Sequence, residues 1–412
     1  MKELLKKGSI VVMLGTGGVG KTTISAALGL AAARAGLNTA LITVDPARRL
    51  REALGLPRLS AQPTRLDKRR LRSAELDGSI QLSAMTLDVK HTWDGLVEQL
   101  VESSEARGRI LENPFYRNLT QQFAGAEAYA ALEQLDELHR SAQFDILIVD
   151  TPPAAHAFEF FEAPRHLVEL LDSSAARWLF TPETRLSRNA LSVASRAARF
   201  VVSQLESFTG TRTLSAISDF FALAAEAAGA LSERFHKTEA LMRSRNVSFV
   251  LVTTPREDRL NHALELAKVT RQHRFRLAAI VLNRMLDERT FGASQGLRRG
   301  APAHLDEIAR LHRMLDGTES RLNKLVEYLE HYRESQLSDI QRAARFANKL
   351  PARITLAITP AVDAGVRDLR SLATLSSILI DSPAGRKFLG QAANTPGVAP
   401  SREHTSRQRS IL

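Results

Sequence analysis

The chain has 412 residues, 44% of them hydrophobic, which suits one large globular α/β domain or two smaller ones. It has no cysteine, no apolar stretch of the roughly 18–20 residues that a membrane span needs, and no secretory signal, so we expect a cytoplasmic protein without disulfides, thiolate metal sites or cysteine nucleophiles. The net charge of +11 lies mostly in residues 65–72 and 383–412, each with five basic residues against one acidic residue. We favour a solvated basic loop and tail over a nucleic-acid-binding surface, and contact with acidic lipid headgroups stays open.

The first predicted elements are a strand over residues 10–14 and an alanine-rich helix over residues 22–34. Between them, residues 15–22 read Gly-Thr-Gly-Gly-Val-Gly-Lys-Thr and match the phosphate-loop pattern GxxxxGK[ST] in full. Glycines let the backbone amides wrap a phosphate, and the helix N-terminus attracts an anion. We therefore expect a nucleotide site in which Lys21 reaches the outer phosphates and the Thr22 hydroxyl ligates Mg²⁺. The predicted phosphate-binding residues are Gly15, Thr16, Gly17, Gly18, Val19, Gly20, Lys21, Thr22 and Thr23.

A second strand is expected over residues 39–44, and Asp45 follows it directly. A carboxylate at this strand end, beside the phosphate loop, suits the orientation of an attacking water. Asp45 is therefore a candidate catalytic residue that also faces the Mg²⁺, partly through water. The alternative is that Asp45 only caps a helix that starts near Pro46.

Further strands are expected over residues 80–87 and 145–149, and Asp150 ends the latter. An apolar strand followed by aspartate is the usual carrier of a Mg²⁺-directed carboxylate, so Asp150 joins Lys21 and Asp45 as a candidate catalytic residue. The metal site then consists of Thr22, Asp45 and Asp150. His156 either senses the γ-phosphate or caps the next helix.

The rest of the chain alternates between helical and strand patterns. A long helical insertion is expected at about 155–245 and a second helical stretch at about 302–349, with strands over 247–253, 277–282 and 354–358. This order predicts a doubly wound, mostly parallel sheet, with ligands beyond the carboxyl ends of its strands. We expect residues 1–393 to form a single ATPase domain and residues 394–412, rich in Pro, Gly, Ser and Arg, to be a disordered basic tail.

Three motifs stand together in this chain: GTGGVGKTT from residue 15, DPARRL from residue 45 and DTPPAAHAFEFFEAPRHL from residue 150. Together they resemble the ArsA family of arsenite-pump and tail-anchored-protein-targeting ATPases, and most closely its bacterial anion-transporting branch. The resemblance implies a P-loop NTPase fold of the deviant Walker A type with ATP and Mg²⁺ as cofactors. It also implies that Asp45 is the catalytic carboxylate of a first switch and that residues 150–156 form a second. Asn283 matches the position that hydrogen-bonds adenine, and the segment after Pro360 closes over the base.

The resemblance implies a partner as well. Family members work as dimers with two ATP molecules near the interface, so we expect a homodimer or a heterodimer with a related ATPase. Our first hypothesis is a chaperone or targeting factor whose helical groove holds a membrane-protein client. The second is the motor subunit of an anion exporter that acts with a membrane permease. The third is a partitioning ATPase that binds DNA or membrane through its basic segments.

Three departures from the family pattern bear on these hypotheses. Thr16 stands where the best-known members carry a lysine that reaches the partner's nucleotide, so either a partner or a nearby arginine, Arg48 or Arg49, supplies that charge. The absence of cysteine removes the thiolates used for arsenite activation and for a dimer-bridging zinc. Methionine is scarce in the insertion, so its apolar stripes are either a client groove or ordinary core.

Overall fold

The computed structural model describes residues 1–44, 48–122, 126–151, 227–285, 337–361 and 368–381, with a few positions between and after these ranges. Eight strands form one sheet in the order β3-β4-β2-β5-β1-β6-β7-β8, and every neighbouring pair is parallel except β3 with β4. The doubly wound α/β prediction is thereby confirmed. The strands are β1 (Ser9–Leu14), β2 (Thr39–Thr43), β3 (Thr64–Arg65), β4 (Leu82–Thr86), β5 (Ile146–Asp150), β6 (Val247–Thr253), β7 (Leu277–Met285) and β8 (Thr355–Pro360).

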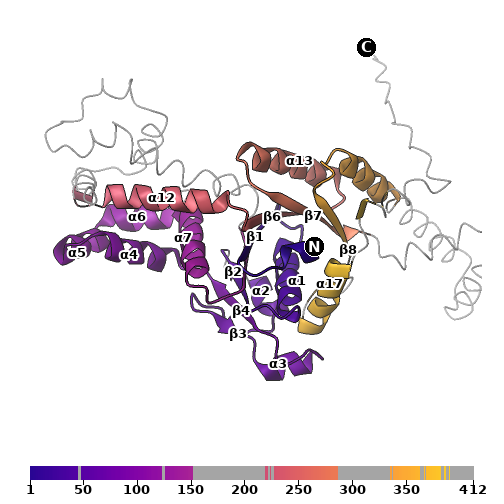
Figure 1. Cartoon of the computed structure of the whole chain (residues 1–412), viewed down its shortest axis with the longest axis horizontal. Helices are drawn as coiled ribbons and strands as arrows, with labels where there is room; N and C mark the ends of the chain where they lie inside the picture. The colour runs from indigo at the N-terminus through magenta and orange to yellow at the C-terminus, as the bar shows by residue number, and fades with distance from the viewer. Residues whose placement is uncertain are drawn as a thin grey trace, which may run out of the picture.

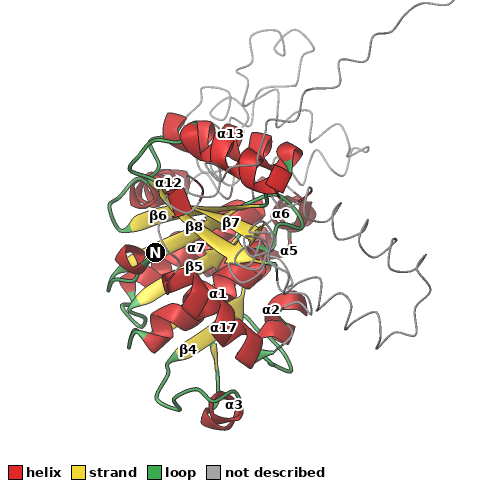
Figure 2. Cartoon of the chain, turned by 90° about the vertical axis from the view of Figure 1, so that its right-hand side faces the viewer, coloured by secondary structure: helices red, strands yellow, loops and turns green. Residues whose placement is uncertain are grey.

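The central strands are mostly apolar and buried along almost their whole length because helices cover both faces of the sheet. In β1, Ile10 and Val12 face one hydrophobic core while Val11 and Met13 face the other. One core packs against α1 (Lys21–Arg34), α2 (Arg48–Ala53) and α17 (Leu369–Asp381). The other packs against α13 (Glu257–Gln272) and a helical segment over residues 337–348. Figure 2 shows α1 and α17 on the side of the sheet opposite α13.

A helical layer extends beyond one end of the sheet (Figure 1). The sequence patterns placed the long helical insertion only after β5, at about 155–245, yet four helices of this layer precede β5 and a fifth, α12, leads into β6. Phe220, from the predicted insertion, packs against Phe115 and Tyr116 with ring centroids 5.3 and 6.1 Å apart. The layer is therefore assembled from both sides of β5. Its helices are α4 (Val89–Leu100), α5 (Ser104–Glu112), α6 (Pro114–Gln122), α7 (Ala126–Arg140) and α12 (Ala228–Met242).

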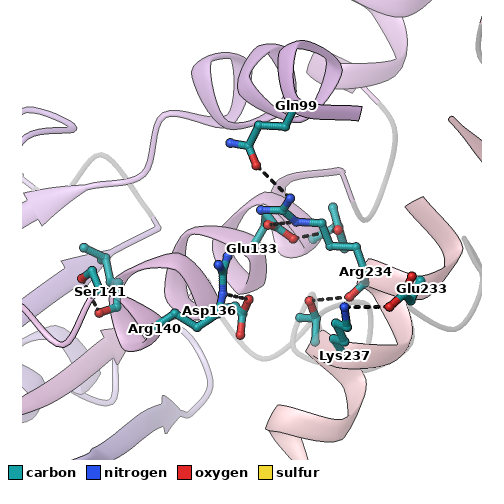
Figure 3. Close-up of polar contacts among 11 residues, drawn as sticks. Gln99, Glu133, Asp136, Arg140, Ser141, Glu233, Arg234 and Lys237 are labelled. Atoms are coloured by element: carbon teal, nitrogen blue, oxygen red, sulfur yellow. Dashed lines mark hydrogen bonds and ion pairs between the residues drawn. The ribbon is translucent and has the colours of Figure 1, made fainter. Parts of the chain in front are cut away.

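A buried polar network fastens α12 to this layer (Figure 3). The Glu133 carboxylate on α7 accepts hydrogen bonds from Arg234 Nε, at 2.5 Å, and from the Tyr129 hydroxyl, at 2.9 Å. Arg234 also donates through Nη1 to Gln99 Oε1 on α4, at 2.8 Å. Burial raises the pKa of the Tyr129 hydroxyl, and the Glu133 carboxylate raises it further, so this hydroxyl stays a donor. Arg234 thus links α12 to two segments that are distant in sequence, α4 and α7.

The structure corrects the prediction of a basic loop at residues 65–72. Arg65 ends β3, and α3 (Lys68–Ser73) follows, with the Asp67 carboxylate accepting the backbone N–H of Arg70 at 2.8 Å as its N-cap. The spacing of apolar residues could not reveal a two-residue strand and a six-residue helix, because both are shorter than the stretch over which such spacing can be recognised. In the part of the chain that the structure describes, no helix is long and apolar enough to cross a membrane. Most of the predicted insertion and the whole tail, residues 394–412, lie outside the described residues.

Candidate active site

The glycine loop runs from the end of β1 to the first residue of α1, as predicted. Gly20 is the N-cap of α1 with φ +89°, and a Cβ at this position would lie 2.3 Å from Asn283 Nδ2. A Cβ on Gly15 would lie 2.6 Å from the carbonyl oxygen of Val252. The loop is thus pressed against the carboxyl ends of β6 and β7, so side chains are excluded there. Gly17 and Gly18 are exposed at the tip, whereas Val19 is buried and anchors the loop in the core.

Lys21 joins α1 to the end of β5. It is the first residue of α1 and only 7% exposed, and its Nζ donates a hydrogen bond to the carbonyl oxygen of Thr151. The Thr151 hydroxyl in turn donates to the carbonyl oxygen of Met13 on β1, at 2.7 Å. Thr22 and Thr23 follow on the first turn of α1 and are half-buried. A phosphate in the loop would therefore compete with the Thr151 carbonyl for the Lys21 ammonium group.

Asp150 is the last residue of β5 and is 1% exposed. Its Oδ1 lies 3.2 Å from the hydroxyl of Ser25, which also lies 2.9 Å from the carbonyl oxygen of Lys21. Sequence reasoning did not identify Ser25 as a site residue. The signal was present, because a residue four positions after Lys21 shares its face of the helix. The contact holds the Asp150 carboxylate beside the first turn of α1.

Asn283 lies behind the loop, at an irregularity of β7. Its Nδ2 donates to the carbonyl oxygen of Val19 at 2.8 Å, and its Oδ1 accepts from the Thr359 hydroxyl at 2.8 Å and from the Arg284 N–H at 3.0 Å. The β7–β8 register shifts between Leu282 and Met285, and Arg284 has φ +60°. Such bulges re-aim side chains next to functional sites. The Asn283 side-chain amide thus connects β8 to the phosphate loop. That Asn283 contacts adenine stays a prediction.

The remaining predicted site residues are only partly described. Pro360 is half-buried at the end of β8, paired in register with Met285. Asp45, His156 and the side chains of Arg48 and Arg49 lie outside the described residues. The backbone N–H of Val44, just before Asp45, donates to the carbonyl oxygen of Asp150 at 3.1 Å. The chain therefore leaves β2 at Val44, beside the backbone of Asp150.

A model of the anion-transporting ATPase family, ArsA_ATPase, matches residues 8–316. The chain belongs to the ArsA family. The match confirms the resemblance carried by the three motifs, and it includes the glycine loop, Asp150 and Asn283 but ends before Pro360.

Three ArsA-family relatives show how far this similarity reaches. ATPase GET3 of Malassezia globosa is 29% identical over 157 residues, which cover 38% of this chain and 43% of the relative. ATPase get3 of Schizosaccharomyces japonicus is 30% identical over 178 residues, 42% of this chain and 49% of the relative. A Halobacterium salinarum protein whose name refers to an arsenical pump-driving ATPase is 29% identical over 157 residues, 36% of this chain and 23% of the relative. The chain thus spans less than half the length of these relatives.

Proposed function

We propose that this chain is an ATP hydrolase of the ArsA family that uses Mg²⁺-dependent hydrolysis as a conformational switch. One observation carries the proposal: Lys21 and Asp150 are both buried beside the glycine loop. Lys21 on α1 donates to the Thr151 carbonyl after β5, and Ser25 on α1 donates to the Asp150 carboxylate at the end of β5. A cation for the outer phosphates and a carboxylate for a phosphate-bound metal are the two groups that phosphoryl transfer needs beside such a loop.

The donor set fits Mg²⁺ that arrives with the nucleotide. Among the residues that the structure describes, no group of three or more His, Cys, Asp and Glu side chains could hold a metal ion by itself. Mg²⁺ is usually held by one or two carboxylates together with phosphate oxygens and water, and hydroxyl and carboxylate oxygens suit it. Thr22 and Asp150, with Asp45, would hold the ion, which neutralises charge on the phosphates when bound.

The switch we propose begins at Lys21. When phosphates enter the loop, the ammonium group exchanges the Thr151 carbonyl for phosphate oxygens, since a charged acceptor makes the stronger hydrogen bond. Thr151 immediately precedes residues 152–156, so the exchange acts on the segment that the family resemblance identifies as the second switch. Residue Asp45 then orients the attacking water from the neighbouring strand end.

For the cellular role we favour membrane-protein targeting or chaperoning by a dimer, as in the tail-anchored-protein-targeting branch that the sequence resembles. Two of the three relatives described above carry the name GET3. The alternative is the soluble ATPase subunit of an anion efflux system, which the family description and the Halobacterium relative favour. Proteins retained by the ATP-locked form and identified by mass spectrometry separate the two roles: a membrane-protein client supports targeting, and a permease supports efflux.

The Asp45→Asn variant provides the ATP-locked form and tests the hydrolase proposal. We expect ATP affinity to stay within a few-fold of wild type while single-turnover hydrolysis slows by at least about a hundredfold, the scale of losing a positioned acid–base group. Rapid-quench measurement of phosphate release gives the rate, and fluorescent-nucleotide titration gives the affinity. Hydrolysis at the wild-type rate would show that Asp45 only caps the following helix.

Ser25→Ala is expected to raise the Mg²⁺ concentration for half-maximal hydrolysis by about tenfold, since a hydrogen bond to a charged group contributes about 1.5–3 kcal/mol. ATP affinity measured without Mg²⁺ should change little, because Lys21 and the loop amides are untouched. Ser25→Thr keeps the hydroxyl and is the matched variant. An unchanged Mg²⁺ dependence in Ser25→Ala, or an equal change in both variants, would contradict the positioning role of this hydroxyl.

A further inference from the structure

A cavity lies at the amino ends of β7 and β8, at the edge of the sheet opposite the glycine loop. It has a volume of about 620 Å³ and is bounded by the short turn η1 (Lys2–Leu4), the end of α13 and the first residues of β7 and β8. Its apolar floor includes Leu4, Phe275 and Ile354, all buried. Because β7 has nine residues and runs between the two edges, the cavity is roughly 25–30 Å from the nucleotide site. Its size is within the usual range for small-molecule sites.

The lining of this cavity is strongly cationic. Its lining includes five basic side chains from three segments and only one carboxylate, that of Glu3. Within the described part of the chain, no ion pair joins any of the five to a carboxylate; Arg276 donates only to the carbonyl oxygen of Arg245, at 3.2 Å. The five are Lys268, Arg271, Arg276, Lys349 and Arg353. We refer to the site as the cationic cavity.

Helix dipoles do not account for this charge. Cations gather at helix C-termini, and α13 and the 337–348 segment both end here. Each end is already served by another arginine, however. Arg243 donates to the carbonyl oxygen of His273 at 3.4 Å, and Arg386 donates to those of Ala347 and Pro351, both at 2.7 Å.

Two of the cavity cations have no helix end to compensate. Arg276 and Arg353 precede β-strands, which carry little net dipole. A groove of about 480 Å³ between α13 and the 337–348 segment shares Leu264 and Lys349 with the cavity. It adds Arg345, one carboxylate, Glu257, and Arg342, which is paired with Asp339. The excess positive charge therefore follows a continuous hollow rather than a single helix end.

We propose that the cationic cavity binds a phosphate-bearing anion at a site separate from the nucleotide site. Lys and Arg side chains drawn from several segments suit the charged oxygens of a phosphate group, and the apolar floor suits a carbon-bearing portion next to it. The phosphate has two possible sources, a free organophosphate and the headgroup of an acidic phospholipid. Anion binding in this cavity does not require that the chain hydrolyse ATP.

Charge reversal within the cavity, compared with an equal reversal elsewhere, tests this site. The cavity variant is Arg271→Glu with Lys349→Glu; the control is Arg58→Glu with Arg109→Glu, which lie outside both the cavity and the basic segment 65–72. All four side chains are exposed, so neither variant should shift the thermal unfolding midpoint. With ADP saturating the glycine loop, binding of inorganic pyrophosphate is measured by calorimetry, and binding of phosphatidylcholine vesicles with and without phosphatidic acid by co-sedimentation.

We expect the cavity variant to weaken binding of at least one probe by about tenfold or more and the control by no more than about twofold, because the control residues do not line the cavity and exposed charges are screened by salt. Binding of pyrophosphate identifies a free organophosphate as the source, and binding only to phosphatidic acid vesicles identifies a lipid headgroup. Equal weakening in both variants would mean that overall charge attracts the probe. That result, or no binding of either probe to wild type, overturns the proposal.

Discussion

Lys21→Ala is expected to abolish ATP hydrolysis and to weaken ATP binding by at least about a hundredfold, because two charge-assisted hydrogen bonds to phosphate contribute about 1.5–3 kcal/mol each. Lys21 is buried at the start of α1, beside the glycine loop, and its Nζ donates a hydrogen bond to the Thr151 carbonyl. Titration with a fluorescent ATP analogue and a phosphate-release assay measure the two effects.

Lys68→Ala is the matched control, since it removes an exposed lysine from α3 and should leave both quantities unchanged. Lys21→Arg should restore little activity, because the broad, planar guanidinium group of arginine cannot take the place of the compact lysine ammonium group. Unchanged affinity and turnover in Lys21→Ala, with a folded protein, would show that the glycine loop is not the site of hydrolysis.

Arg234→Met is expected to lower the free energy of unfolding by about 3–5 kcal/mol, because it leaves the Glu133 carboxylate buried without its cation. In this pair the side chain of Glu133 is only 3% exposed and that of Arg234 is 20% exposed, so the carboxylate cannot regain water. Since Arg234 also bonds Gln99, the variant loosens α12 from both α4 and α7. Urea denaturation followed by circular dichroism measures the change.

Two comparisons isolate the buried pair from general effects on α12. Lys237→Met removes the exposed Lys237–Glu233 pair, 68% exposed on both sides, and should cost at most about 1 kcal/mol. The double variant Glu133→Leu with Arg234→Met should recover most of the stability, because no unpaired charge is then left buried. If Arg234→Met costs no more than Lys237→Met, the network does not fasten α12 to the helical layer.

The amino-acid sequence by itself determined the features that depend on short stretches of chain. A run of apolar residues identifies a strand buried on both faces, so seven of the eight strands were predictable. The glycine loop and the aspartate ending β5 were predictable for the same reason, since each consists of consecutive residues at a strand end. The family followed from the three motifs, which are also local.

Only the tertiary structure decided which distant residues meet. The Ser25–Asp150 contact joins residues 125 positions apart, and Asn283 reaches Val19 across 264 positions. Helices α7 and α4 join α12 through the contacts of Arg234 with Glu133 and Gln99, residues that the sequence shows only as ordinary polar positions. The cationic cavity likewise draws its charges from three segments. A sequence pattern reports the environment of a residue along its own helix or strand, whereas these contacts depend on how the helices and strands pack around the sheet.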